Sequence, residues 1–460
     1  MTIVGTRPEL IKMSRVIDQF DKFTNHILVH TGQNYNYSLN QVFFEDLNIR
    51  EPDYFLNTAG DSSLKTTAKI LEKIDDILEK ENPDAVMLYG DTNSCLSVIA
   101  VKKRKIPIFH MEAGNRCFDQ RVPEEINRKI IDHLSDINLV LSEHARNYLI
   151  SEGIKPETII KTGTHMYEVL NYYFPKIISS NILDKLQLIE KKYFLISIHR
   201  EENTDDINKM DNLIILLNGI AEKYKYPVIV STHPRTKNML EEIKKITLDK
   251  NVQFLEPFGF TDYIKLQLNA ACIISDSGTI TEEAMILNLP AITIRNSHER
   301  PEGNDYGALI MSNISKDNVI NNIDFILKQN LVCNKNIESI PFNEKFKVSN
   351  KIFKVVCGYI DYINRNKYNK SKKTQVDRSI QTLQTKFARD RAGENMKRYA
   401  GQILNDSLRE FDATLNLAKA KDAGLNYVVY QGSNIPTTRD FCRLVRNGNY
   451  DKRKGGLFTR

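Results

Sequence analysis

The chain has 460 residues, about three times the commonest domain length, so two or three domains are expected. Its composition, 41% hydrophobic and 27% charged, is that of an ordinary globular protein. No apolar run approaches the roughly 20 residues of a membrane span, and no basic stretch precedes an apolar segment at the N-terminus. Six scattered cysteines without a CxxC pair argue against zinc ribbons and disulfide scaffolds. We therefore expect a cytoplasmic protein with neither a membrane span nor a signal peptide.

The net charge of +6 is unevenly distributed. Residues 371–460 hold 18 of the 64 Lys and Arg and 9 of the 58 Asp and Glu, a net charge of +9. Residues 1–370 therefore carry −3. Because the basic excess belongs to the C-terminal tail alone, nucleic acid is not an expected partner of the main body.

Two series of short, β-branched, continuously apolar runs alternate with stretches of helical periodicity. The first series comprises 26–30, 85–91, 106–114 and 137–143, and the second comprises 193–200, 226–234, 251–257, 271–278 and 290–296. Continuous apolar strands separated by helices are typical of parallel sheets covered on both faces. The sequence therefore predicts two doubly wound α/β domains with a ligand cleft at the carboxyl ends of their strands.

Three acids follow consecutive segments of the first series. Asp91 ends one predicted strand, Glu112 ends the next, and Glu124 begins the helix after that. Each alone could be a helix cap or a surface acid. Three in consecutive connections predict acid–base chemistry. His110 and Glu112 do not predict a metal site, because no third ligand stands at a familiar spacing.

Anion sites are predicted in both halves. Arg7 follows a glycine turn and Lys12 lies on the next helix, although an ordinary loop with two solvated cations would look the same. In the second half, Ser277 and Gly278 form a turn at a helix N-terminus, and Glu283 lies one turn into that helix, where plain capping is the alternative. No GxGxxG follows the first strand, so NAD is not indicated. The residues together predict an enzyme that acts on a nucleotide-sugar.

Seven motifs occur in order over residues 1 to about 360: GTRPE, GDT, HxEAG, PEEINR, HRE, DSGxIxEE and ERPE. Together they resemble the non-hydrolysing UDP-N-acetylglucosamine 2-epimerase family. The resemblance implies a GT-B-type fold, with two Rossmann-like domains, an interdomain cleft and usually a homodimer. The expected divisions are an N-terminal domain (1–165), a UDP-binding domain (166–345), a helix crossing back to the first domain (346–366), and a basic linker with a mainly helical tail (367–460).

The resemblance also implies a reaction and residue roles. UDP is eliminated to leave a 2-acetamidoglycal and is then added back with the proton on the other face of C2, without metal or NAD. The implied catalytic residues are Asp91, Glu112, Glu124 and His199. The implied substrate-binding residues are Arg7 and Lys12 on phosphate, Ser277, Gly278 and Arg300 on the diphosphate, Glu283 on the ribose, Tyr263 beside the uracil, and Arg128 orienting the acids. Preorganised cations suit such a leaving group, and which carboxylate removes the C2 proton stays open.

Two features refine the resemblance. The segments 110–149, 276–284 and 294–308 resemble a capsule and O-antigen branch more than the housekeeping branch, and that branch completes UDP-N-acetyl-L-fucosamine or UDP-N-acetyl-L-quinovosamine. Residues 31–37 lack the Gln-His-Arg loop that some members use to bind UDP-N-acetylglucosamine as an activator, so allosteric activation is not expected. Family members usually begin with two or three more residues, so the first strand should be short.

The tail and the competing functions complete the set of expectations. Residues 371–460, chiefly around 426–448, resemble a piece of phage minor head proteins, with a lineage-specific appendage or gene fusion as the alternative and a basic helix that binds nucleic acid as a third option. Three rival functions remain: a GT-B glycosyltransferase, a hydrolysing epimerase that releases UDP, and a virion or scaffold protein in which the tail is the function. The three acids fit proton transfer at C2 better than activation of an acceptor.

Overall fold

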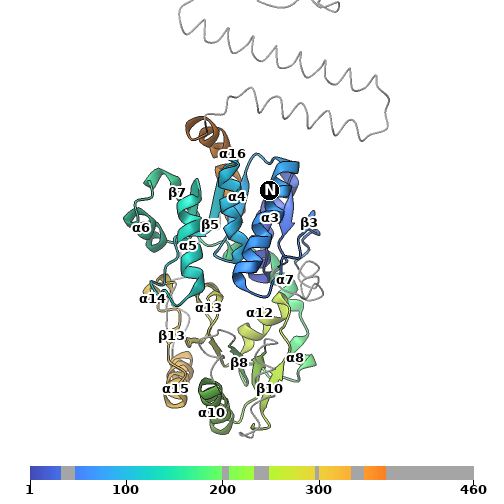
Figure 1. The fold of residues 1–460 in the computed structure, drawn as a ribbon. Coiled ribbons are helices and arrows are strands. Elements are labelled where there is room, and N and C mark those ends of the chain that lie inside the picture. The colour runs from blue at the N-terminus through green and yellow to red at the C-terminus, as the bar shows by residue number, and fades with distance from the viewer. Residues whose placement is uncertain (33–46, 199–206, 233–247, 296–299, 333–346, 369–460) are drawn as a thin grey trace, which may run out of the picture. The chain divides into compact units, whose positions relative to one another are not determined.

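The computed structural model describes residues 1–32, 47–198, 207–232, 248–295, 300–332 and 347–368 (Figure 1). Met1–Tyr368 form one unit and Asn369–Arg460 another, and the second lies wholly outside the described residues. Among the described residues, no helix is long and apolar enough to cross a membrane.

The first sheet has seven parallel strands in the order β3-β2-β1-β4-β5-β6-β7. Its strands are β1 (Thr2–Val4), β2 (Leu28–His30), β3 (Tyr54–Phe55), β4 (Val86–Tyr89), β5 (Ile108–Ala113), β6 (Ile137–Val140) and β7 (Ile159–Lys161). The helices along this part of the chain are α1 (Arg7–Phe23), α3 (Ser63–Glu81), η1 (Asn93–Ser97), α4 (Val98–Lys103), α5 (Pro123–Leu134), α6 (Glu143–Ser151) and η2 (Pro156–Thr158). Although β1 has only three residues, it lies between β2 and β4 in the middle of the sheet.

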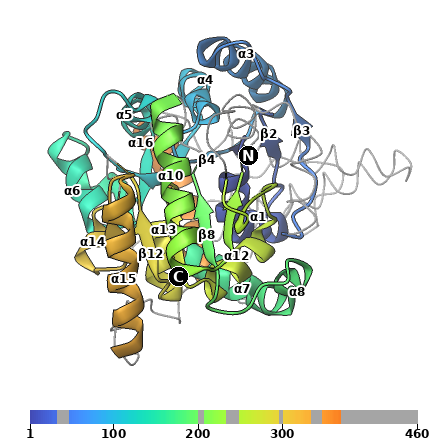
Figure 2. The same ribbon diagram turned by 90° about the horizontal axis from the view of Figure 1, so that it is seen from below.

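The second sheet has six parallel strands in the order β10-β9-β8-β11-β12-β13. Its strands are β8 (Phe194–Ser197), β9 (Val228–Ser231), β10 (Val252–Leu255), β11 (Cys272–Ser275), β12 (Ala291–Thr293) and β13 (Ile310–Met311). The remaining helices are α7 (Met166–Ser179), α8 (Ile182–Lys185), α10 (Ile207–Tyr224), α12 (Phe260–Asn269), α13 (Thr279–Leu287), α14 (Glu302–Asp305), α15 (Lys316–Val332) and α16 (Val348–Asn366). Helices α10 and α15 lie side by side against this sheet (Figure 2).

Each sheet is apolar on both faces because its strands alternate side chains between two cores. In β8, Phe194 and Ile196 pack with α10 and α15, whereas Leu195 packs in the opposite core with α12 and α13. In β4, Met87 and Tyr89 lie in one core while Val86 and Leu88 lie in the other. Burial on both faces is why these strands read as continuous apolar runs. The predicted fold class, two Rossmann-like sheets of a GT-B-type fold, is confirmed.

Helix α16 follows the second sheet in the chain but packs on the first. Its buried face, which includes Ile352, Val356 and Ile363, joins the core formed by α1, β4 and β5. The ring of Phe353 lies 5.5 Å from that of Phe20 on α1. The chain thus returns to its first half. Tyr368, two residues beyond the end of α16, donates a hydrogen bond to buried Asp136 at 2.9 Å.

Candidate active site

The expected acids and anion-binding residues lie at the carboxyl ends of the parallel strands. Asp91 follows β4 through Gly90, whose φ of +71° turns the chain, and Glu112 stands near the end of β5. Glu112 itself has a φ of +61°, at an irregularity in the pairing of β5 with β6. Left-handed backbone is uncommon for a residue with a side chain and is typical of bulges beside active sites. The bulge aims this carboxylate away from the regular alternation of the strand.

Two cations and two carboxylates from distant parts of the chain form a buried charge cluster, which we define as Lys12, Glu112, Glu282 and Arg300. Lys12 Nζ lies 2.8 Å from Glu112 and 3.3 Å from Glu282. Arg300 lies 2.8 Å from Glu112 and 3.3 Å from Glu282. Every one of these side chains is at most 11% exposed. Because two residues come from the first half and two from the second, the cluster ties the two halves together.

The charge cluster sets the protonation of its members. Burial by itself would raise the pKa of Glu112, but the charges of Arg300 and Lys12 hold that pKa well below the usual range. Burial likewise opposes the charged form of Glu282, and the same two cations lower its pKa. Burial also opposes the charge of Arg300, yet the carboxylates raise its pKa well above the ordinary value. Burial opposes the charge of Lys12 as well, but Glu112 and Glu282 raise its pKa, so all four groups are charged at neutral pH and the charges balance.

Two further groups border the cluster. The hydroxyl of Tyr89 donates a hydrogen bond to Glu112 and lies 3.1 Å from His165 Nε2. Burial lowers the pKa of His165 to about 4, so this imidazole is neutral. Since the Tyr89 hydrogen points to Glu112, His165 Nε2 is the donor to the phenol oxygen.

Asp91 is held by Arg128 of α5. Arg128 Nε donates to Asp91 at 2.8 Å, and its Nη1 donates to Glu125 at 3.0 Å. Glu125 is fully buried and also accepts hydrogen bonds from the backbone N–H groups of Cys117 and Phe118. It therefore fixes the loop before α5. Glu124, the neighbouring acid, is half-buried in the first turn of α5.

Glu9 connects the first anion loop to the loop of Asp91. Its carboxylate accepts hydrogen bonds from the backbone N–H of Gly5 and Thr6 and from the hydroxyl of Thr92. Burial raises the pKa of Glu9 to about 7, although those hydrogen bonds oppose the shift. The side chain thus caps the N-terminus of α1 and fixes the turn at Gly5 and Thr6 that precedes Arg7.

A cavity of about 240 Å³ lies between the anion loops of the two halves. Its lining is Arg7, Pro8, Ile11, Lys12, Met166, Ser197, Ser231, Pro257, Phe258, Phe260, Tyr263, Ser277, Thr279 and Glu283. Five expected substrate-binding residues therefore share one cavity, and Gly278 lies between two residues of its wall. Arg300 is not part of the lining, but it pairs with Glu282, the carboxylate that also pairs with Lys12 of the cavity wall. Glu283 accepts a hydrogen bond from Gln267 at 2.7 Å, and burial raises its pKa.

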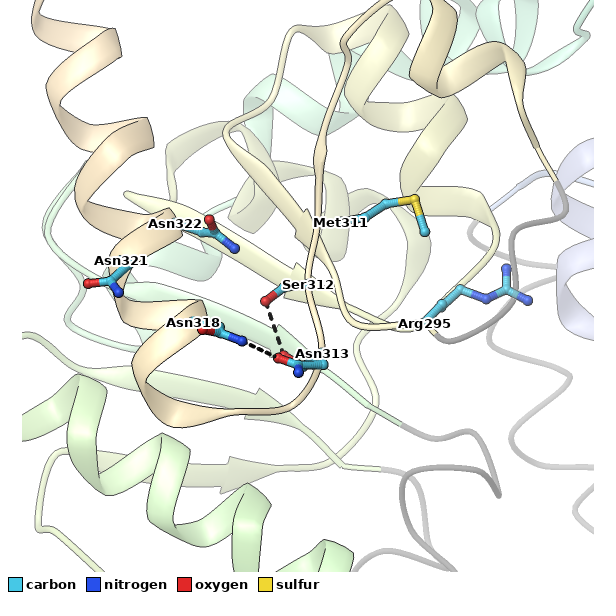
Figure 3. A pocket seen from close by; sticks show the side chains of 7 residues that line it. All are labelled: Arg295, Met311, Ser312, Asn313, Asn318, Asn321 and Asn322. Carbon is cyan, nitrogen blue, oxygen red and sulfur yellow. Dashed lines mark hydrogen bonds between the residues drawn. The ribbon is translucent and has the colours of Figure 1, made fainter.

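A larger, more open groove of about 460 Å³ lies at the β13 edge of the second sheet (Figure 3). Its lining is Arg295, Met311, Ser312, Asn313, Asn318, Asn321 and Asn322. Asn318 donates a hydrogen bond to the side chain of Asn313 at 2.9 Å, and the Ser312 hydroxyl donates to the carbonyl oxygen of Asn313 at 3.1 Å. Among the described residues, its lining has no carboxylate or imidazole for proton transfer, so we place the candidate active site at the smaller cavity.

The structure thus brings together most of the residues expected from sequence, and it adds others. Among the expected residues, only His199 lies outside the described part of the chain. Glu282, Tyr89 and Glu9 were missed. Glu282 is adjacent to the expected Glu283 and Glu9 lies inside the GTRPE motif, so both had a local signal; Tyr89 reads from sequence as an ordinary apolar strand residue.

Comparison with known proteins agrees with this geometry. The family model described as UDP-N-acetylglucosamine 2-epimerase matches residues 18–356. The chain is a member of the UDP-N-acetylglucosamine 2-epimerase family. It is therefore an isomerase, and the expected family and enzyme class are confirmed.

Relatives within this epimerase family differ in the sugar that their names state. A UDP-N-acetylglucosamine 2-epimerase from Methanococcus maripaludis is 38% identical over 75% of this chain and 98% of its own length. A UDP-2,3-diacetamido-2,3-dideoxy-D-glucuronate 2-epimerase from Pseudomonas aeruginosa is 34% identical over 70% of this chain and 90% of its own. The structure of a UDP-N-acetylglucosamine 2-epimerase from Rickettsia bellii is 56% identical with a TM-score of 0.75, covering 80% of this chain and 99% of that one. A Methanocaldococcus jannaschii UDP-GlcNAc 2-epimerase, solved with UDP-GlcNAc and UDP, is 34% identical with a TM-score of 0.71, covering 77% and 98%.

Proposed function

We propose that this chain inverts C2 of a UDP-N-acetylhexosamine without hydrolysing it. A base removes the C2 proton, the C1–O bond breaks with its electron pair going to UDP, and a C1=C2 double bond forms. The resulting 2-acetamidoglycal then takes UDP back at C1 while an acid delivers a proton to the opposite face of C2. No redox change occurs and no water is consumed, so the step needs only acids, bases and a stabilised leaving group.

The observation that carries this proposal is the charge cluster beside the cavity. Lys12 lines the cavity and also contacts Glu112, so one cation faces both the place for an anion and a candidate acid. Asp91, held by Arg128 at 2.8 Å, provides a second carboxylate at the end of the neighbouring strand. Cations for a departing diphosphate therefore stand next to carboxylates for proton transfer, as elimination of UDP requires.

We assign roles to the residues on that basis. Glu112, Asp91 and Glu124 are the candidate acid–base groups, oriented by Arg128, and His199 is proposed to act near the leaving diphosphate. Arg7, Lys12, Arg300 and the N-terminus of α13 at Ser277 and Gly278 are proposed to hold the diphosphate. Glu283 is proposed to bind the ribose, and Tyr263 to lie beside the uracil.

For the sugar we propose a 6-deoxy-L-hexosamine, as in precursors of UDP-N-acetyl-L-fucosamine for capsule or O-antigen. The support is in the sequence, where segments 110–149, 276–284 and 294–308 resemble the capsule and O-antigen branch more than the housekeeping branch. UDP-N-acetylglucosamine is the second candidate, favoured by the names of the relatives in Methanococcus maripaludis and Rickettsia bellii.

Proton NMR of the purified protein with each UDP-sugar in heavy water tests these proposals. Deuterium entering C2 of a UDP-N-acetyl-L-talosamine-type 6-deoxy sugar, with its C2 epimer appearing, is the expected result. Deuterium entering C2 of UDP-N-acetylglucosamine alone would identify that sugar, the second candidate, as the substrate. Free UDP accumulating with free N-acetylmannosamine would identify a hydrolysing enzyme, and silence with both sugars would contradict the proposed reaction.

Two further expectations concern the setting of the enzyme. We propose a homodimer in the cytoplasm, where UDP-sugars are made. Sedimentation at the enzyme concentration of the assay tests the homodimer, and a monomer that retains full turnover would contradict it.

The same NMR assay separates an epimerase from a glycosyltransferase. A glycosyltransferase would instead transfer the sugar to an added acceptor and would leave the C2 proton in place.

A further inference from the structure

His110 is a buried imidazole whose two ring nitrogens both face acceptors. Its Nε2 lies 2.7 Å from the carbonyl oxygen of Gly90, and its Nδ1 lies 2.8 Å from a carboxylate oxygen of Asp132. A carbonyl oxygen can only accept, and so can an ionised carboxylate. Asp132 also accepts hydrogen bonds from Arg116 and from the backbone N–H of Gly114, so its carboxylate is an acceptor on every side. The ring of His110 therefore bridges the carbonyl oxygen of Gly90 and the carboxylate of Asp132.

This imidazole connects the three segments that carry the candidate acids. Gly90 immediately precedes Asp91. His110 itself lies two residues before Glu112 on β5, and Asp132 lies on α5, the helix that begins with Glu124. One side chain thus bonds the end of β4 to α5 from a position on the strand between them.

Asp132 extends the connection to the far side of Glu112. It accepts a hydrogen bond from the backbone N–H of Gly114 at 3.2 Å and from Arg116 at 2.7 Å. Arg116 is itself fully buried and continues to Glu152 at 2.6 Å. His110 and Gly114, two residues before and two residues after Glu112, are therefore both hydrogen-bonded to Asp132.

We propose that His110 is a positioning residue for proton transfer at C2, a buried imidazole held by Asp132 that fixes the Asp91 loop, the Glu112 bulge and α5 in one arrangement. This inference rests on the proposed function. His110 touches backbone and Asp132 and not the reacting atoms, so it acts through the acids and is not itself catalytic. A displacement of about 1 Å in such a constellation can cost about a hundredfold in rate.

Two substitutions separate the two bonds of the ring. The amide nitrogen of Asn occupies roughly the place of Nδ1, so His110→Asn keeps the bond to Asp132 and loses the bond to Gly90. The longer Gln places its amide near Nε2, so His110→Gln keeps the bond to Gly90. Because Gly90 carries Asp91, we expect His110→Asn to lower kcat by about a hundredfold and His110→Gln to lower it distinctly less. KM and the Kd for UDP should stay within about threefold, since His110 does not line the cavity.

His26 provides a matched control at the opposite end of the same sheet. It is also a buried imidazole whose two ring nitrogens are hydrogen-bonded, one to Asp21 at 2.6 Å and the other to Thr2 at 2.8 Å. The side chains of His26 and His110 are each 2% exposed. His26→Asn should lower Tm as His110→Asn does. It should leave kcat within about twofold, because the hydrogen bonds of His26 do not involve the segments that carry the acids and therefore affect stability alone. Equal losses of kcat in the two variants, or a kcat of His110→Asn near that of the wild type, would overturn the positioning role.

A spectroscopic measurement tests the two ring contacts of His110 without any substrate. In wild-type protein with ¹⁵N-labelled histidine, the signal that His110→Gln removes should belong to a ring N–H that is hydrogen-bonded and exchanges slowly with solvent. A ring whose hydrogens all exchange rapidly with solvent would overturn the bridge even in an active epimerase. Wild-type protein that exchanges no UDP-sugar would instead overturn the proposed function, and the positioning role would fall with it.

Discussion

Removing one charge from the cluster should expose how strongly the two halves depend on its balance. Arg300→Met leaves Lys12 facing both Glu112 and Glu282, so a net negative charge is buried where every side chain is at most 11% exposed. Breaking a buried pair by removing one partner costs about 3 to 5 kcal/mol. We expect Arg300→Met to lower the free energy of unfolding by about 3 kcal/mol.

The double variant Arg300→Met with Glu282→Gln restores the balance, because Lys12 and Glu112 remain as one pair at 2.8 Å. We expect a coupling energy of about 2 kcal/mol, within the range for groups in one buried network. Urea unfolding of the wild type, both single variants and the double variant measures it. Losses that simply add within about 0.5 kcal/mol would refute the account of the cluster as a coupled unit.

A control and a second readout sharpen this test. Arg104 makes ion pairs at the surface with Asp75 and Glu79, so Arg104→Met should leave Tm nearly unchanged. Affinity for UDP should fall in Arg300→Met and should not return in the double variant, because the proposed diphosphate contact is still missing. Recovery of UDP binding together with stability would show that Arg300 serves only the cluster.

Three further outcomes follow from the same geometry. Asp91→Asn and Glu124→Gln should each lower kcat by about a hundredfold or more, and near-normal turnover in the NMR assay would remove either acid from the catalytic set. The folded pKa of Glu9, about 7, lies above its ordinary value of 4.5, so wild-type stability should fall by up to about 3 kcal/mol as the pH rises from about 4.5 to 7. Glu9→Gln should flatten that fall in urea titrations at each pH, and an unchanged slope would contradict the buried carboxyl. Deleting residues 371–460 should leave turnover nearly intact, and a loss of more than about tenfold would show that the tail contributes to activity.

The sequence predicted the elements that combine a long apolar run with polar residues at its end. Strands β4, β5, β8, β9 and β11 were expected within a few residues of their observed bounds. Strands β3, β7 and β13 were missed, because two or three residues at a sheet edge carry no periodic pattern.

The acids were predictable because parallel strands bring their carboxyl ends to one edge. The partners of those acids were not. Arg300 and Glu112 are 188 positions apart, and nothing local to either residue indicates the contact. The left-handed backbone of Glu112 was equally invisible, since Glu has no particular preference for it. Long-range charge pairing and local strain thus depend on the assembled fold, whereas strand ends depend on the local sequence.

The cluster also bears on how a carboxylate with a lowered pKa could act as a base. Lys12 and Arg300 lower the pKa of Glu112, and both are proposed to bind the diphosphate. A bound diphosphate competes for these cations, while the burial that raises the pKa remains. Binding of UDP should therefore raise the pKa of Glu112 and take up protons, more at pH 6 than at pH 8. Calorimetry in buffers of different ionisation enthalpy measures this uptake, with Glu112→Gln as the control that subtracts the phosphate's own ionisation. Equal proton uptake by the wild type and Glu112→Gln would mean that the cations stay on Glu112, and the base would then have to be Asp91 or Glu124.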